Sequence, residues 1–84
     1  MIQELERVAL TVDLPAYGLK QGDIGTVMLV HRGGDGYEVE FITLDGETVG
    51  ILSLFASQVR PLGRREIANA RPLEERRAQP VALT

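Results

Sequence analysis

The chain has 84 residues, no cysteine and a formal net charge of −3, and 44% of its residues are hydrophobic. A chain of this length forms one small domain, and the absence of cysteine excludes disulfides and thiolate metal sites. Residues 1–6 include two glutamates and no basic residue, whereas a signal peptide begins with basic residues. No apolar run approaches the roughly 20 residues of a membrane helix. We therefore expect a soluble, cytoplasmic protein.

The charge is divided unevenly along the chain. Residues 1–62 contain four basic and nine acidic residues, a net charge of −5, whereas residues 63–84 contain five basic and three acidic residues, a net charge of +2. Nucleic-acid binding depends largely on the neutralisation of phosphates by lysine and arginine. The acidic first part of the chain therefore argues against nucleic acid as a partner.

The first predicted strand, residues 5–12, leads into a loop over residues 13–23. In this loop the Asp23 carboxylate is expected to accept hydrogen bonds from nearby backbone N–H groups. A glycine-rich loop can also bind phosphate, but the GxxxxGK[ST] spacing is missing and a strand follows instead of a helix. The second predicted strand covers residues 24–31, where Gly25 would allow a bend or a close backbone approach. Its apolar residues occupy both parities, so both of its faces should be covered.

The glycine-rich segment 32–36 predicts a hairpin that leads into a third strand over residues 36–43. The side chains of this strand alternate between apolar and acidic residues. We expect the apolar side chains of Tyr37, Val39 and Phe41 in the core. The acidic side chains of Glu38 and Glu40 should then lie on the opposite face.

The pair Asp45-Gly46 predicts a second tight hairpin, because a type I′ turn needs a positive φ at both central residues. A fourth strand over residues 48–54 follows. Residues 55–58 interrupt the β pattern for about one turn, with Phe55 expected in the core. A short last strand over residues 59–62 then contains Pro61, which is tolerated at the edge or end of a sheet.

Five short antiparallel strands with a single 3₁₀ turn are typical of a small SH3-like barrel, in which closure of the sheet removes exposed edges. We predict an all-β barrel over residues 1–62 and a partly helical or disordered tail over residues 63–84. Residues 64–70 could form about two helical turns, and residues 74–77 are helix-compatible. We expect residues 64–72 to lie over the barrel and the remainder to be mobile.

Catalytic groups are scarce in this chain. A nucleophile triad requires a base that contacts the other members of the triad. The only histidine, His31, ends a predicted strand and has no obvious partner. The carboxylates of Glu38 and Glu40 are explained by the polar face of an antiparallel strand. We therefore expect no enzyme activity, no catalytic or metal-binding residues and no cofactor.

Protein binding is better supported by the pattern. Tyr17 could anchor an interface through its ring, or it could pack on the barrel as a lid. Apolar residues of both parities in 27–30 and 49–54 indicate an outer face covered either by the tail or by a partner chain, so a homodimer and a hetero-complex both remain open. The predicted partner-binding residues lie in the loop and around the tail: Tyr17, Leu19, Lys20, Arg60, Arg64, Arg65, Ile67 and Arg71.

Four motifs in chain order carry a family resemblance: DLPxxGLxxGDxGTVxxV, GYEVEF, LDGETVxxLxLxxSQVRPL and RREIA. From Val8 to about Ala70 the chain resembles a family of short bacterial proteins classed as a domain of unknown function, many of which read DLPEYGL where this chain reads DLPAYGL. Over a shorter stretch, GxxGDxGTV is similar to KOW modules of translation proteins and to the SH3-like domain of the nitrile hydratase β subunit. This chain departs from the family pattern at Pro72 and in the short C-terminal segment after it, which contains alanine and arginine.

Genes of the family that this chain resembles often lie beside another small protein gene, an arrangement similar to toxin–antitoxin or immunity pairs. The resemblance therefore implies a non-catalytic protein-binding module, the antitoxin- or immunity-like half of a bacterial pair, with a partner encoded nearby. A fold does not determine a function. The alternatives are a KOW-like nucleic-acid-binding domain and an accessory subunit of an enzyme complex.

Overall fold

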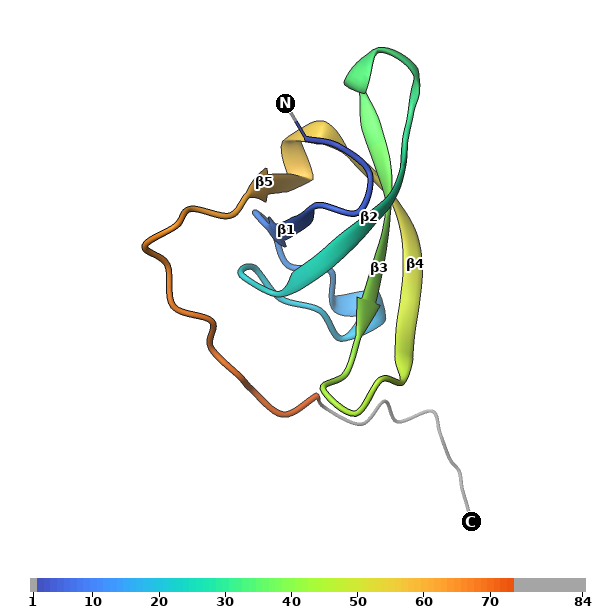
Figure 1. Cartoon of the computed structure of the whole chain (residues 1–84). Helices are drawn as coiled ribbons and strands as arrows, with labels where there is room; N and C mark the ends of the chain where they lie inside the picture. The colour runs from blue at the N-terminus through green and yellow to red at the C-terminus, as the bar shows by residue number, and fades with distance from the viewer. Residues whose placement is uncertain (1, 74–84) are drawn as a thin grey trace.

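The computed structural model describes residues 2–73, which form five strands and three short 3₁₀ helices (Figure 1). The predicted order of strands is confirmed, and the strand bounds differ from those expected by no more than about two residues. The elements are β1 (Arg7–Leu10), η1 (Pro15–Tyr17), β2 (Ile24–Val30), η2 (Arg32–Gly34), β3 (Gly36–Ile42), β4 (Thr48–Phe55), η3 (Ala56–Gln58) and β5 (Val59–Pro61).

All five strands belong to one antiparallel sheet with the order β4-β3-β2-β1-β5. The edge strands β4 and β5 are therefore connected only by the three residues of η3. In a flat sheet these edges would lie about 19 Å apart, because neighbouring strands are spaced by about 4.8 Å. The chain from Phe55 to Val59 can span at most about 14 Å. The sheet must curl strongly, and Figure 1 shows η3 and β5 folded back across it.

The concave side of the curled sheet holds the core. The predicted core face of β3 is confirmed, because its three apolar side chains are buried. Phe55, which we expected in the core, is 73% exposed, so that prediction is wrong. It has the strand parity of Ile51 and Ser53, opposite to that of the buried Leu52 and Leu54. The core consists of Val8, Leu10, Leu19, Val27, Tyr37, Val39, Phe41, Leu52, Leu54 and Val59.

Gly25 allows β2 to pass close to the core side chains of β3. A Cβ atom at this position would lie 2.6 Å from Val39 Cγ1 and 2.8 Å from Phe41 Cε2. Real Cβ atoms essentially never make such short contacts. The predicted close backbone approach at Gly25 is therefore confirmed.

The hairpin between β3 and β4 forms as predicted, but its turn is not type I′. Gly46 has a φ of 91°, whereas Asp45 does not have a positive φ. The Gly46 N–H donates to the Thr43 carbonyl at 2.9 Å, and the Thr43 N–H donates to the Glu47 carbonyl at 2.8 Å. The Thr43 hydroxyl also donates to the Asp45 carboxylate and accepts from the Glu47 N–H. These side-chain bonds fix a wider loop than the two-residue turn.

Residues 62–73, here called the strap, leave β5, pass away from the sheet and return to it near the β3–β4 hairpin (Figure 1). The strap contains no helix, so the two helical turns expected over residues 64–70 are wrong. A helix of two turns is marginal by itself, and here both ends of the segment are held by ion pairs to Arg60 and Asp23. The second predicted helix, residues 74–77, lies outside the described residues.

Candidate functional site

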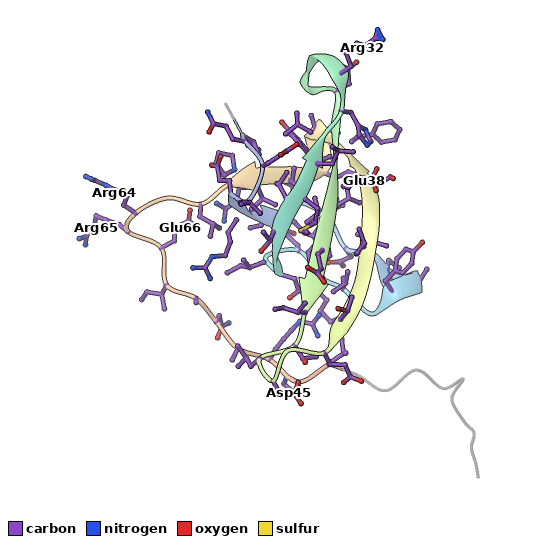
Figure 2. All side chains as sticks on the ribbon, turned by 45° about the vertical axis from the view of Figure 1, so that its right-hand side comes forward. Arg32, Glu38, Asp45, Arg64, Arg65 and Glu66 are labelled. Atoms are coloured by element: carbon purple, nitrogen blue, oxygen red, sulfur yellow. The ribbon has the colours of Figure 1, made fainter. Side chains whose placement is uncertain are left out.

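The convex side of strands β2, β3 and β4, here called the outer face, is the most distinctive surface of the described chain. Cross-strand register places the side chains of Leu29, Glu38 and Ser53 in one row and those of Thr26, Glu40 and Ile51 in the next. Figure 2 shows the Glu38 side chain pointing out from this side of the sheet. The outer face comprises Thr26, Leu29, Glu38, Glu40, Ile42, Ile51, Ser53 and Phe55.

Large apolar side chains on the outer face are exposed. The exposed fractions are 49% for Leu29, 54% for Ile42, 56% for Ile51 and 73% for Phe55. We expected the tail or a partner to cover such a face. The described part of the tail, up to Leu73, lines a cleft together with Ile42 at one end of this face. It leaves Leu29, Ile51 and Phe55 exposed.

A hydrogen-bonded cluster lies at the centre of the outer face. His31 Nε2 is 2.6 Å from Glu38 Oε2, and the Ser53 hydroxyl donates to the same oxygen at 2.5 Å. The bonds from Ser53 and then from His31 lower the pKa of Glu38 below its ordinary value. The Glu38 carboxylate is therefore ionised at neutral pH. In the next row the Thr48 hydroxyl donates to Glu40 Oε2 at 3.0 Å.

The partner of His31 was missed at the sequence level. The β2–β3 hairpin folds the chain back, so that Glu38 lies beside a residue seven positions earlier. A cross-strand register through the predicted hairpin was the signal that could have found the pair. The arrangement differs from a hydrolase triad, in which the serine bonds to the histidine and the histidine bonds to the carboxylate. Here Ser53 and His31 both bond to the same carboxylate oxygen, Glu38 Oε2, instead of to each other.

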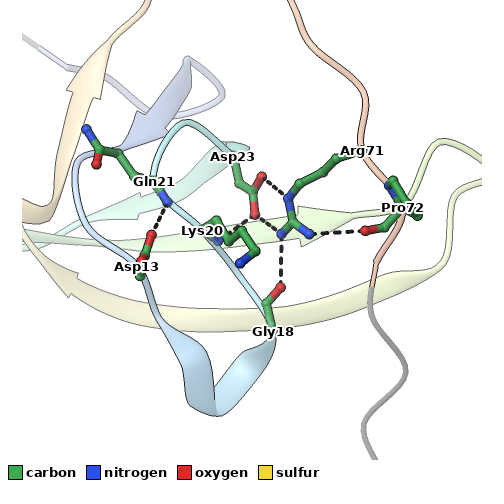
Figure 3. Close-up of polar contacts among 7 residues, drawn as sticks. All are labelled: Asp13, Gly18, Lys20, Gln21, Asp23, Arg71 and Pro72. Carbon is green, nitrogen blue, oxygen red and sulfur yellow. Dashed lines mark hydrogen bonds and ion pairs between the residues drawn. The ribbon is translucent and has the colours of Figure 1, made fainter.

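The strap is held to the 13–23 loop by Arg71 (Figure 3). Its Nε lies 2.9 Å from Asp23 Oδ1, and its Nη2 lies 2.5 Å from Asp23 Oδ2 and 2.9 Å from the Gly18 carbonyl. The Lys20 N–H also donates to Asp23 at 2.7 Å, which confirms the predicted bonding of this carboxylate to the backbone. Burial alone would raise the pKa of Asp23, but the bonds from Arg71 and Lys20 outweigh it and lower that pKa.

The other end of the strap is held by Arg60. Its two terminal nitrogens each donate to a Glu66 oxygen at 2.8 Å, and the Gly63 N–H donates to Glu66 at 2.6 Å. These bonds, that of Arg60 first, lower the pKa of Glu66 to about 2. The guanidinium groups of Arg60 and Arg71, two of the predicted partner-binding residues, thus have intramolecular partners.

A cleft of about 680 Å³ lies between the strap and the sheet. Side chains from the loop, from both sides of the β3–β4 hairpin and from the strap line it. Its apolar lining includes Leu19, Ile24, Phe41, Ile42, Val49 and Leu73.

The structure brings only some of the predicted partner-binding residues together: Leu19, Lys20 and Arg71 lie close to one another where the strap contacts the 13–23 loop. Leu19 is only 4% exposed and belongs to the core, whereas Tyr17 is half-exposed and Lys20 is exposed. Figure 2 shows Arg64 and Arg65 pointing outward from the farthest part of the strap, where Ile67 is almost fully exposed. The outer face was not among the predicted sites, although the parity of the apolar residues in β2 and β4 had indicated it.

Two further findings concern the described residues. Among residues 2–73, no group of three or more His, Cys, Asp and Glu residues is arranged to hold a metal ion. Within the same part of the chain, no helix has the length and apolarity that a membrane crossing requires.

These features define a small all-β protein with one curled antiparallel sheet, an outer face with apolar side chains that the described residues leave exposed, and a strap after β5. The chain belongs to the family described as "Domain of unknown function (DUF4926)", whose family model matches residues 4–61. The matched region includes all five strands and ends with β5, immediately before the strap. No curated protein and no solved structure matches the chain. The predicted membership in a family without an assigned activity is therefore confirmed.

Proposed function

We propose that this protein is a non-catalytic protein-binding module of the cytoplasm, and that its outer face contacts a partner protein with apolar and basic groups. The observation that carries the proposal is the exposure of Leu29, Ile42, Ile51 and Phe55 around the carboxylates of Glu38 and Glu40. Exposed apolar side chains that are contiguous and bordered by polar groups are typical of protein interaction sites.

Charge supports a basic partner. Residues 1–62 have a net charge of −5, and Glu38 is held in its ionised form by two hydrogen bonds. Complementary charges increase the association rate and select the correct partner. An acidic protein that neutralises a basic one matches the antitoxin- or immunity-like half of a bacterial pair, and we propose this as the biological role, with the partner encoded nearby.

The finer architecture that we propose is an SH3-like barrel. The support is the strand order β4-β3-β2-β1-β5 together with the one-turn helix that joins the two edges of the sheet. In such a barrel the loops and the outer face carry the interactions, while the core carries the stability. Tyr17, Arg64, Arg65 and Ile67 are exposed away from the outer face and would serve as secondary contacts.

The exposed Arg64 and Arg65 favour one alternative, a KOW-like interaction with nucleic acid. If this alternative holds, the protein will bind RNA at low salt, with an affinity that falls steeply as salt is added. Replacement of both arginines by glutamine would then abolish RNA retention. Absence of retention at low salt would remove this alternative.

The test of the main proposal is recovery of the partner from nuclease-treated native lysate with tagged protein, followed by mass spectrometry. We expect the unmodified chain to recover one partner protein in stoichiometric amount. With Ile51→Asp or Phe55→Ser, the amount of that partner recovered should fall at least tenfold. The matched comparison is Ile67→Ser, which also removes an exposed apolar side chain but only from a secondary contact on the strap, so we expect it to cause a smaller loss. Equal recovery with all variants would refute the outer face as the binding surface.

The partner's own residues distinguish the remaining roles. A partner that carries metal ligands or a catalytic constellation would identify this chain as an accessory subunit of an enzyme complex. If only this chain is recovered, and in a complex larger than a monomer, the proposed hetero-complex is wrong and the chain forms a homodimer instead.

A further inference from the structure

The two edges of the sheet differ in how they are protected. The edge strand β5 has three residues, one of which is Arg60 and one Pro61. Short length, charge and proline are the usual features that prevent an edge from pairing with another chain. The edge strand β4 has eight residues, TVGILSLF, with no charged residue and no proline. After an irregularity near Ile42 its pairing with β3 is continuous, so the edge that β4 presents from Gly50 to Phe55 contains no bulge.

Hydrogen-bond alternation shows which backbone groups of β4 face away from β3. The Ala56 N–H donates to the Asp35 carbonyl at 3.0 Å, and in an antiparallel pair every second residue bonds to the neighbouring strand. Leu54, Leu52 and Gly50 therefore bond to β3. The intervening Ser53 and Ile51 direct their N–H and C=O groups away from it.

The contacts of Phe55 agree with this assignment. Its N–H donates to the Gln58 side chain at 2.8 Å and not to β3. Gln58 thus closes the end of the edge, and the groups of Ile51 and Ser53 remain directed outward.

The side chains of the same residues lie on the outer face. Small Ser53 lies between the exposed Ile51 and Phe55, and its hydroxyl contacts the Glu38 carboxylate in the next strand. A long basic side chain on a strand added beside β4 could pass over Ser53 and reach Glu38. Charge-assisted hydrogen bonds of this kind are stronger than neutral ones.

We infer that β4 binds an extended segment of the partner protein by β-strand addition, with apolar side chains beside Ile51 and Phe55 and a lysine or arginine that crosses Ser53 to Glu38. In this mode the main-chain hydrogen bonds provide affinity and the alternate side chains provide specificity. The inference rests on the proposed function and specifies how the outer face is used.

The observations favour a basic segment over a second copy of this chain. A β4 strand paired with another β4 strand would join two uncharged edges and place no cation near Glu38 or Glu40. A segment with alternating apolar and basic residues satisfies the open backbone groups and the carboxylates together.

The test uses the full-length protein and the synthetic peptide Lys-Thr-Ile-Thr-Lys-Thr-Phe-Thr-Lys. In an extended strand its lysine, isoleucine and phenylalanine side chains share one face and its threonine side chains share the other. Binding is followed by NMR titration and by hydrogen exchange of individual amides. We expect the amides of Ile51 and Ser53 to exchange rapidly in the free protein and at least about tenfold more slowly in the complex. The same peptide with N-methyl groups on alternate amides, or with glutamate in place of lysine, should bind at least tenfold more weakly.

Two variants at one position separate backbone pairing from side-chain contact. Ser53→Pro removes an N–H that faces away from β3, and proline is tolerated at such an edge position, so we expect Kd to rise at least tenfold. Ser53→Ala keeps the N–H and should change Kd by less than threefold. Because the methylated peptide is tested on the unmodified protein, the outcome does not depend on the folding of the proline variant.

Equal binding of the methylated and unmethylated peptides, no protection at Ile51 and Ser53, or no binding of the peptide would each overturn the inference, as would self-association through β4. The proposed function is tested separately. If Phe55→Ser abolishes recovery of the lysate partner while Ser53→Pro does not, the outer face binds the partner without strand addition. If neither variant affects recovery, the proposed function itself is wrong.

Discussion

The two faces of β4 contain similar residues but have different environments. Leu52 and Leu54 face the core and are buried, whereas Ile51 and Phe55 alternate with them and are exposed. Of these four residues, folding therefore buries only the two that face the core. The difference shows that strand parity, and not hydrophobicity, separates the residues that stabilise the sheet from those that are available for a partner. The following predictions test this separation, from the largest expected effect on stability to the smallest.

The largest effect is expected in the core. Phe41 is 2% exposed, whereas its neighbour Ile42 is more than half exposed on the outer face. Phe41→Ala should lower the free energy of unfolding by about 3–5 kcal/mol, because it removes buried apolar area and leaves a cavity. Ile42→Ala should lower it by less than about 1 kcal/mol. Urea denaturation of both variants checks the contrast, and equal losses would show that the outer face also contributes to folding.

The second effect concerns the close approach of β2 to β3. Gly25→Ala should cost about 1–3 kcal/mol, because the new Cβ would overlap the Val39 and Phe41 side chains. Gly50→Ala in β4 is the matched control, since its Cβ would make an ordinary 3.6 Å contact with Leu52. Thermal denaturation of the two variants measures the difference. An unchanged melting temperature for Gly25→Ala would contradict the close packing of Gly25 against the Val39 and Phe41 side chains.

The third effect concerns the attachment of the strap. The folded-state pKa of Asp23 is lower than its ordinary value of 3.8. Its stabilising contribution is therefore complete above that ordinary pKa and is lost as pH falls through the folded-state value. We expect Asp23→Asn to lower the unfolding free energy at pH 7 by about 1–2 kcal/mol. This value lies near the lower end of the range of about 1.5–3 kcal/mol for hydrogen bonds to charged groups, because the Arg71–Asp23 pair is partly exposed.

Denaturation curves from pH 7 down to pH 2 provide the measurement for Asp23. The difference between the unmodified protein and Asp23→Asn should disappear as the carboxylate becomes protonated. The exposed pair Arg60–Glu66 offers a comparison, and Glu66→Gln should have a smaller effect at pH 7, because solvent screens exposed ion pairs. A constant difference at all pH values would assign the effect of Asp23→Asn to packing.

The smallest effect on stability is expected on the outer face. Phe55→Ser and Ile51→Ser should change the unfolding free energy by no more than about 0.5 kcal/mol, as is usual for surface positions. Phe55→Ser should nevertheless weaken partner binding at least tenfold, which corresponds to about 1.4 kcal/mol. Paired measurements of stability and partner affinity test this prediction. A large loss of stability in either variant would show that the exposed apolar residues support the fold.

Sequence reasoning located the strands accurately because local signals define them. The alternation in β3, the glycine-rich turn before it and Asp45-Gly46 after it are all short-range features. The same reasoning failed where a residue has two local options. Phe55 was expected in the core because aromatic residues are usually buried, but its parity in β4 directs it outward. The helix expected over residues 64–70 is locally permitted, yet the ion pairs of Glu66 with Arg60 and of Arg71 with Asp23 hold this part of the chain in the strap.

By itself, the sequence determined the all-β class, the number and order of the strands, the inward face of β3 and the acidic character of residues 1–62. These properties depend on composition, alternation and turn residues, which act over a few positions. Only the tertiary structure decided the contacts between distant residues, namely the bond of His31 and Ser53 to one carboxylate and the attachment of Arg71 to Asp23. It also decided the position of β4 at an edge of the sheet. These contacts join residues of different strands, or of a strand and the strap, so they depend on the pairing and the curl of the whole sheet.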